Sequence, residues 1–194
     1  MSIFELYFKL GLQHIADLKG YDHILFILTL CVVYRLTEWR KLLILITAFT
    51  IGHSLTLVLA TLNLLRIDGD LIEWLIPLTI FITALANVLM DRKQHSPALH
   101  KFKYFAALFF GLIHGLGFSN YLRALLGSEK SMLLPLFSFN LGIEIGQILI
   151  VAIILLLSMV VIDLLKYPRR DWHLLLSGAG LGISLILMIE RFPF

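Results

Sequence analysis

The sequence predicts an all-α protein, a polytopic transmembrane helical bundle of six spans in one domain that covers residues 1–194. Two observations predict this class. Hydrophobic residues make up 59% of the chain and charged residues 15%, whereas soluble domains typically contain about 45–50% apolar and about 25% charged residues. The apolar residues also gather in runs near the roughly 20 residues that a helix needs to cross the hydrocarbon core. A water-soluble globule and a disordered chain are therefore excluded.

Six apolar runs are the candidate spans, and they follow one another with short polar connections: 21–34, 42–65, 71–90, 102–119, 132–165 and 172–189. The first run is short for a span, and the third is interrupted only by Pro77. The fifth run is long enough to tilt or bend. Because the runs fill most of the chain, no room is left for a separate soluble domain.

The N-terminal stretch, residues 1–19, is apolar but carries Glu5, Lys9 and Asp17. Its length fits a short interfacial or re-entrant helix on the outer face better than a seventh span, which stays as the alternative. The stretch lacks both a basic segment before its apolar run and a small-residue cleavage site. It is therefore not expected to be a cleavable signal peptide.

The basic residues predict the orientation of the bundle. Ten Lys and Arg residues lie in the connections 35–41, 91–103 and 166–171, against six on the other side. An excess of this kind marks cytoplasmic loops, so we expect these connections in the cytoplasm and the C-terminus outside. The net charge of +3 therefore marks one face of a bilayer, and no nucleic-acid partner is expected.

Polar side chains within the runs are few and patterned. Asn140, Glu144 and Gln147 are spaced to share one face of the helix 132–165. A carboxylate within a span is costly and rarely kept without a role. Three polar residues form a milder stripe on the third run, which we interpret as packing: Thr79, Thr83 and Asn87.

The remaining polar and ionisable residues of interest stand in the outer half to the middle of the runs, or just before them: His14, Asp17, Asp22, His23, His53, Ser54 and His114. Taken singly, Asp22 is explained by the favourable dipole of a helix N-terminus. At a rise of about 1.5 Å per residue, however, all these groups gather toward one face, and the cytoplasmic half is almost purely apolar. We therefore predict one site, or a short descending chain of sites, open to the outside.

The chemistry of these groups suits a divalent transition metal. Imidazoles with carboxylates and no thiolate favour Ni²⁺, Zn²⁺, Co²⁺ or Cu²⁺, whereas Mg²⁺ and Ca²⁺ prefer more oxygen ligands. The single cysteine, Cys31, excludes a disulfide framework and a cysteine cage for zinc or iron–sulfur. The expected ligands are His14, Asp22, His23, His53, His114 and Glu144. The residues expected to orient these ligands through hydrogen bonds are Asp17, Asn140, Gln147 and Ser54.

Four segments carry most of these residues and follow one another along the chain: "GYDHILF" (20–26), "AFTIGHSLTL" (48–57), "FGLIHGLGFS" (110–119) and "FNLGIEIGQ" (139–147). Together they resemble the HupE/UreJ family, small bacterial membrane proteins associated with hydrogenase and urease accessory functions and regarded as nickel permeases. The resemblance implies a bacterial inner (plasma) membrane location and nickel handling. The positions that it implies for the metal are His14, Asp22, His23, His114 and Glu144.

Two departures indicate the second, less characterised branch of that family. Seven residues separate His14 from Asp22, where the hydrogenase-associated branch has five. No glutamate follows His114 closely, although the better-known motif of that branch carries one.

These observations favour a nickel or related metal permease that is open to the periplasm. His14, Asp22 and His23 would capture the ion, and His53, His114 and Glu144 would pass it inward. No Walker motif is present, so the chain itself carries no ATP-driven pump.

Two alternative functions and the oligomeric state stay open. A zinc-dependent intramembrane hydrolase at the outer leaflet would use Glu144 or Asp22 as general base. A metal-binding chaperone or sensor would need the same site without a path. The glycine pairs Gly142/Gly146 and Gly178/Gly182 allow close helix approach, either within one copy or in a homo-oligomer.

Overall fold

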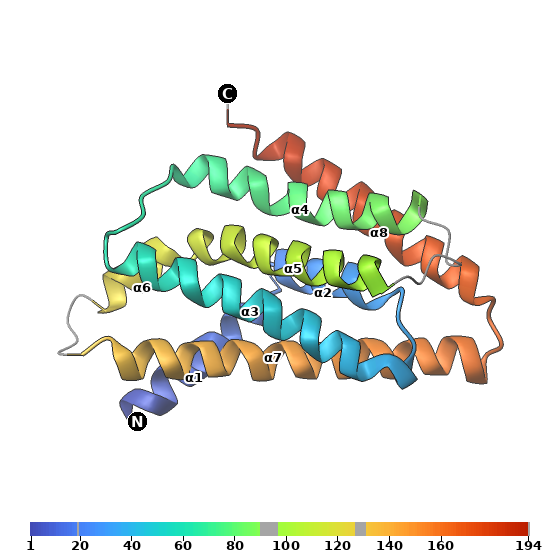
Figure 1. Ribbon diagram of the computed structural model, residues 1–194, viewed down its shortest axis with the longest axis horizontal. Coiled ribbons are helices and arrows are strands. Elements are labelled where there is room, and N and C mark those ends of the chain that lie inside the picture. Colours follow the sequence, from blue (N-terminus) through green and yellow to red (C-terminus); the bar gives the residue numbers. More distant parts are fainter. Residues whose placement is uncertain (19, 90–96, 127–130, 194) are drawn as a thin grey trace.

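The computed structural model describes residues 1–18, 20–89, 97–126 and 131–193, and every regular element in these ranges is helical (Figure 1). The all-α prediction is confirmed. The α-helices are α1 (Ile3–Ile15), α2 (Asp22–Cys31), α3 (Trp39–Thr61), α4 (Gly69–Leu89), α5 (Pro97–Gly117), α6 (Ser119–Leu126), α7 (Leu133–Met159) and α8 (Arg169–Glu190). A 3₁₀ turn, Leu36–Glu38, leads into α3, and a π-helical turn, Val160–Leu164, ends α7.

Four helical segments of the described chain are long and apolar enough to cross a membrane: Leu36–Thr61, Gly69–Leu89, Leu133–Leu164 and Arg169–Glu190. A fifth is reached if His100–Gly117 and Ser119–Leu126, which bend by 53°, form one span. The prediction of six spans is therefore not confirmed. The predicted run 102–119 lies almost wholly in α5, which ends at Gly117, and the bend comes where this run ends and α6 begins.

The structure differs most from the prediction at the expected first span, 21–34. Its helix, α2, has 10 residues and is therefore about 15 Å long, half the thickness of the hydrocarbon core. Figure 1 shows α1 leading from the N-terminal end toward the middle of the molecule, and α2 continuing toward the opposite end. The N-terminal stretch and the first run thus form two half-length helices, separated by a break at 16–21.

A capping box starts α1. The hydroxyl of Ser2 accepts a hydrogen bond from the backbone of Glu5, and the Glu5 carboxylate accepts one from the backbone of Ser2. The helix then packs along α7. A Cβ at Gly11 would meet the Phe139 carbonyl oxygen, and one at Gly142 would meet that of Phe8. Glycine on both helices is therefore what allows this close approach.

The glycine pairs differ in what surrounds them. Gly142 and Gly146 both face α1 within the same chain. No described atom lies within 4 Å of a Cβ placed at Gly178 or Gly182. The first pair therefore serves a contact within the monomer, and a homo-oligomer stays a prediction.

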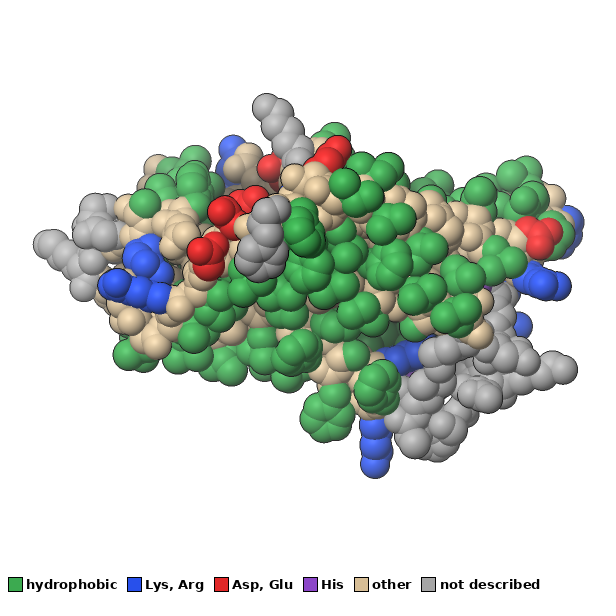
Figure 2. Space-filling view, turned by 90° about the horizontal axis from the view of Figure 1, so that it is seen from above, with side chains coloured by type: hydrophobic (Ala, Val, Ile, Leu, Met, Phe, Trp, Pro, Cys, Tyr) green, Lys and Arg blue, Asp and Glu red, His purple; other side chains and the backbone are tan. Residues whose placement is uncertain are grey.

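The long helices pack in pairs, with α3 along α5 and α4 along α8. The α3–α5 contact is close because Gly52 faces the Leu108 carbonyl, and Gly111 faces that of Phe49. Hydrophobic side chains cover most of the middle of the face seen in Figure 2, and charged side chains lie at its two ends and along its upper and lower edges. This distribution suits a lipid bilayer around the middle of the molecule.

Candidate metal centre

Four histidines from four helices converge beside the two helix breaks. His14 lies in the last turn of α1, and His23 in the first turn of α2. His53 comes from the interior of α3, and His114 from the end of α5. The ring centroids of His14 and His23 are 4.6 Å apart, and those of His23 and His114 are 5.1 Å apart. The breaks at 16–21 and Phe118 therefore bring together side chains that are distant in sequence.

Three of these rings form a group with the geometry of a metal site. His14, His23 and His53 each offer one ring nitrogen, and the three nitrogens lie within 4.8 Å of one another. In a tetrahedral site with metal–nitrogen bonds of about 2.0–2.1 Å, the ligand nitrogens are about 3.3 Å apart. Small side-chain rotations would therefore bring the three nitrogens to ligand distance. We call these residues the three-histidine cluster.

Four of the six ring nitrogens of the cluster are buried and lack a hydrogen-bond partner in the described chain. They are Nε2 of His14, Nε2 of His23 and both nitrogens of His53. Leaving a buried polar group unsatisfied costs about 1–3 kcal/mol, and most buried polar groups are therefore paired. Several unpaired nitrogens side by side indicate a place for a ligand that the chain does not supply.

Aromatic rings hold the histidines in place. The Phe118 ring lies 4.1 Å from that of His14 and stacks on Phe139 at 5.1 Å. The His114 ring is fully buried and lies 5.1 Å from Phe49. These aromatic rings form an apolar wall beside the histidines.

A pocket of about 260 Å³ leads to the cluster. It lies where α4 begins and α8 ends, and its lining includes His14, His23 and His114. His53 is not part of this lining and is fully buried. Three acidic residues also line the pocket: Asp17, Asp22 and Glu73. His14, His23 and His114 are thus reached from one end of the molecule through a pocket that acidic side chains also line.

Asp22 is engaged by a basic residue from the far end of the chain. Arg191 donates to its carboxylate at 2.9 and 3.4 Å. Burial lowers the pKa of the Arg191 guanidinium, but the hydrogen bond and charge of Asp22, with Glu73 and Tyr21, outweigh burial and raise that pKa above its ordinary value. Arg191 therefore stays charged, and the expected ligand Asp22 is held in an ion pair at the mouth of the pocket.

The other predicted polar residues lie between α3 and α7, outside the three-histidine cluster. Their hydrogen bonds run from Thr47 to Glu144 at 2.6 Å, from Thr50 to Gln147 at 2.8 Å and from Ser54 to Asn140 at 2.6 Å. The second carboxylate oxygen of Glu144, Oε2, is buried without a partner in the described chain. Glu144 is thus placed on a neighbouring interface and not among the clustered ring nitrogens.

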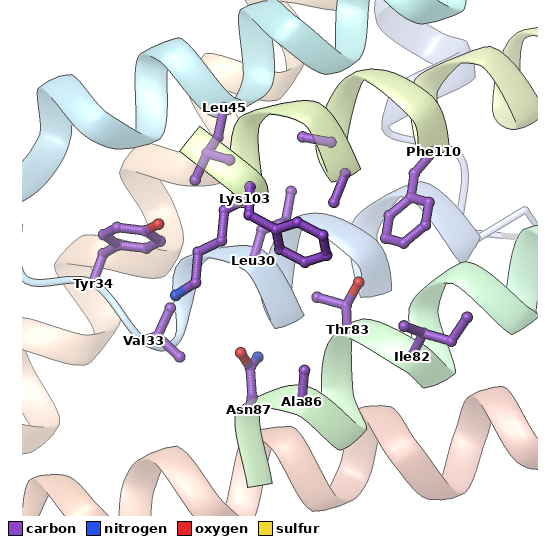
Figure 3. A pocket seen from close by; sticks show the side chains of 13 residues that line it. Leu30, Val33, Tyr34, Leu45, Ile82, Thr83, Ala86, Asn87, Lys103 and Phe110 are labelled. Carbon is purple, nitrogen blue, oxygen red and sulfur yellow. The ribbon is translucent and has the colours of Figure 1, made fainter. Parts of the chain in front are cut away.

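A separate pocket of about 130 Å³ lies between the ends of α2 and α4 and the start of α5 (Figure 3). Its lining is largely apolar, with Leu30, Leu45 and Phe110 among its side chains, and Lys103 and Asn87 at one side. None of its lining residues is a histidine or a carboxylate. Of these two pockets, the one beside the histidines has the metal-binding groups.

Comparison with known proteins places the chain in a family. A family model described as HupE / UreJ protein matches residues 1–190. The chain belongs to the HupE/UreJ family. No curated protein and no solved structure matches it. Membership suggests a transporter of a metal such as nickel or cobalt, and the long apolar helices indicate a membrane protein.

The site of this HupE/UreJ protein includes residues that the sequence did not single out. Arg191 was counted only among the basic residues, and Thr79 was interpreted as packing, yet they contact Asp22 and His114 respectively. Phe118 stands within the segment "FGLIHGLGFS", but no sequence signal relates it to His14. Imidazole donors without a thiolate suit the borderline ions nickel, cobalt, copper and zinc.

Proposed function

We propose that this HupE/UreJ protein is a permease that carries a divalent transition metal, nickel first, through the bacterial inner membrane. The metal is the cargo of the protein. The observation that carries the proposal is the three-histidine cluster, whose ring nitrogens are unpaired, close together and reached through a pocket from one end of the bundle. The same donors also accept cobalt, copper and zinc.

The mouth of the pocket supplies the first step. Asp17, Asp22 and Glu73 line it, with Arg191 as the opposing charge. Acidic residues in a low-dielectric cleft raise the local concentration of cations. His14, His23 and His53 then replace the water around the ion with imidazole nitrogens. We place this mouth on the periplasmic side, because the connections rich in Lys and Arg lie at the other ends of the long helices.

A polar route is available beyond the cluster. Ser54 follows His53 on α3, and its hydroxyl donates to Asn140. Thr50 and Thr47 continue on α3 toward Trp39 and donate to Gln147 and Glu144. From His53 to Thr47 the helix advances about 9 Å at its usual rise. We propose that the ion leaves along this α3–α7 interface, where the unpaired Glu144 oxygen can take the ion or a proton.

The geometry favours transport over metal-dependent hydrolysis. A hydrolase of the expected kind would use the Asp22 or the Glu144 carboxylate beside the metal as general base. Of the two residues expected for that role, Asp22 is paired with Arg191 and Glu144 is bonded to Thr47 outside the cluster. A chaperone or sensor would share the cluster but would not move metal across a membrane.

Uptake of radioactive nickel into liposomes that contain the purified protein tests the proposal. Wild-type protein should fill the liposomes with nickel, and His53→Gln should abolish both nickel binding and uptake. His173→Gln is the matched control, because His173 is also a buried histidine but lies on α8. Nickel binding without uptake would replace the permease with a chaperone or sensor. Equal uptake by wild type, His53→Gln and protein-free liposomes would refute metal transport.

A further inference from the structure

The hydroxyl of Thr79 contacts a neighbouring histidine. Thr79 is buried on α4, and its Oγ1 lies 2.7 Å from the carbonyl oxygen of Ile76 and 3.0 Å from Nε2 of His114. A hydroxyl has one hydrogen to donate, and the structure directs it to the carbonyl of Ile76. In that arrangement the Thr79 oxygen accepts from Nε2–H of His114, which is one of the two roles that the contact allows.

This hydrogen bond determines which nitrogen of His114 is free. A neutral imidazole carries a hydrogen on one nitrogen and a lone pair on the other. With the hydrogen on Nε2, the lone pair is on Nδ1. That nitrogen is buried and has no hydrogen-bond partner in the described chain. The centroid of the His114 ring lies 5.1 Å from that of His23, so the ring that carries this nitrogen stands beside the three-histidine cluster.

We propose that Thr79 is a positioning residue, which holds His114 in the Nε2–H form so that Nδ1 can take the metal beside His23. Metal-binding histidines commonly donate their second ring N–H to an oxygen acceptor, and this contact fixes the ring and its tautomer. The inference rests on the proposed metal handling and adds to it the means by which the fourth histidine becomes competent to bind.

Thr83 provides an internal comparison. It lies one helical turn beyond Thr79 on α4, and its hydroxyl also donates to its own helix, at 2.8 Å to the Thr79 carbonyl. Its side chain lines the separate pocket of Figure 3 and not the pocket of the histidines. Replacing Thr83 therefore removes the same kind of hydroxyl from the same helix without the contact to His114.

Nitrogen NMR of the full-length, metal-free protein, labelled at the histidine ring nitrogens, tests the tautomer. The wild-type His114 signals, assigned by their loss in His114→Gln, should show a protonated Nε2 and an unprotonated Nδ1. Thr79→Ser and Thr83→Val should keep this pattern. Thr79→Val should lose it, because the acceptor for Nε2–H is gone. A wild-type protein with the hydrogen on Nδ1 would overturn the inference even if no variant folds.

Nickel titration of the same proteins tests the consequence. Loss of a contact that orients a ligand typically lowers metal affinity by about 10–100-fold. Thr79→Val should show this loss, while Thr79→Ser and Thr83→Val keep the wild-type affinity. An unchanged affinity in Thr79→Val, despite an altered tautomer, would overturn the role of Thr79. If nickel binds in this Thr79-dependent way but is not taken up into liposomes, the permease proposal fails and the role of Thr79 stands.

Discussion

Arg191, at the end of the last helix, donates two hydrogen bonds to the carboxylate of Asp22, the residue directly before His23. The pair joins α8 to α2 across the mouth of the pocket. It also holds a fixed positive charge where a metal cation would arrive. The affinity of the site for metal is therefore a balance between the acidic groups of the pocket and this guanidinium.

Substitutions of Arg191 and of Asp22 should shift the affinity for nickel in opposite directions. Arg191→Gln should tighten nickel binding, because it removes the opposing charge and frees the Asp22 carboxylate. Asp22→Asn should weaken binding, because Arg191 is left without its counter-charge. At an effective dielectric constant of about 20, two unit charges about 8 Å apart interact by about 2 kcal/mol, which corresponds to about 30-fold in affinity. Because solvent and salt at the mouth of the pocket screen these charges, we expect changes of about tenfold or more. Calorimetric titration at low and high salt is the measurement, and the changes should shrink as salt screens the charges. Equal affinities in both variants would contradict this account.

The close contact between α3 and α5 should not tolerate a side chain at Gly52. A Cβ there would meet the carbonyl oxygen of Leu108 and the backbone nitrogen of Leu112. Overpacking of this kind typically costs about 1–3 kcal/mol, so Gly52→Ala should lower the melting temperature in detergent.

Gly178→Ala is the matched control, since no described atom lies within 4 Å of its Cβ position. Alanine is favoured over glycine in a helix by about 1 kcal/mol, so this control should be neutral or slightly stabilising. Identical destabilisation of the two variants would contradict the assigned contact.

Glu144 should matter for movement of the metal and not for its capture. Glu144→Gln keeps an oxygen that can accept from Thr47 but removes the charge. The three-histidine cluster does not include this residue, so nickel affinity should stay at the wild-type value. Uptake into liposomes should fall by about tenfold or more, the factor that corresponds to about 1.4 kcal/mol. A lower nickel affinity in Glu144→Gln would show that the carboxylate reaches the cluster. Normal uptake would remove Glu144 from the route.

The proposed orientation can be measured by cysteine labelling. The natural Cys31 is buried, so it should react little with a membrane-impermeant maleimide. Asp70→Cys, in the exposed first turn of α4 near the histidine pocket, should be labelled from outside the cell. Tyr167→Cys, in the exposed connection between α7 and α8, should be labelled only after the membrane is opened. Labelling in the reverse pattern would place the histidine pocket on the cytoplasmic side.

Much of the local structure was predictable from sequence. Apolar runs indicated α3, α4, α7 and α8, because a long hydrophobic helix is the only way for such a segment to satisfy its backbone in lipid. The first run was misleading, since an apolar segment of this length fits both a short span and a buried half-helix. Only the structure, in which α2 ends after 10 residues, shows that this run forms a short helix.

The sequence by itself determined the chemistry of this protein: a membrane-embedded helical chain with imidazoles and carboxylates and a single cysteine. The tertiary structure decided which of those groups meet. It joined His14, His23 and His53, turned Asp22 toward Arg191 and placed Glu144 against Thr47. The physical reason is that hydropathy depends on composition along one helix, whereas coordination depends on distances between helices. Those distances are set here by glycine contacts and by two breaks in the helices.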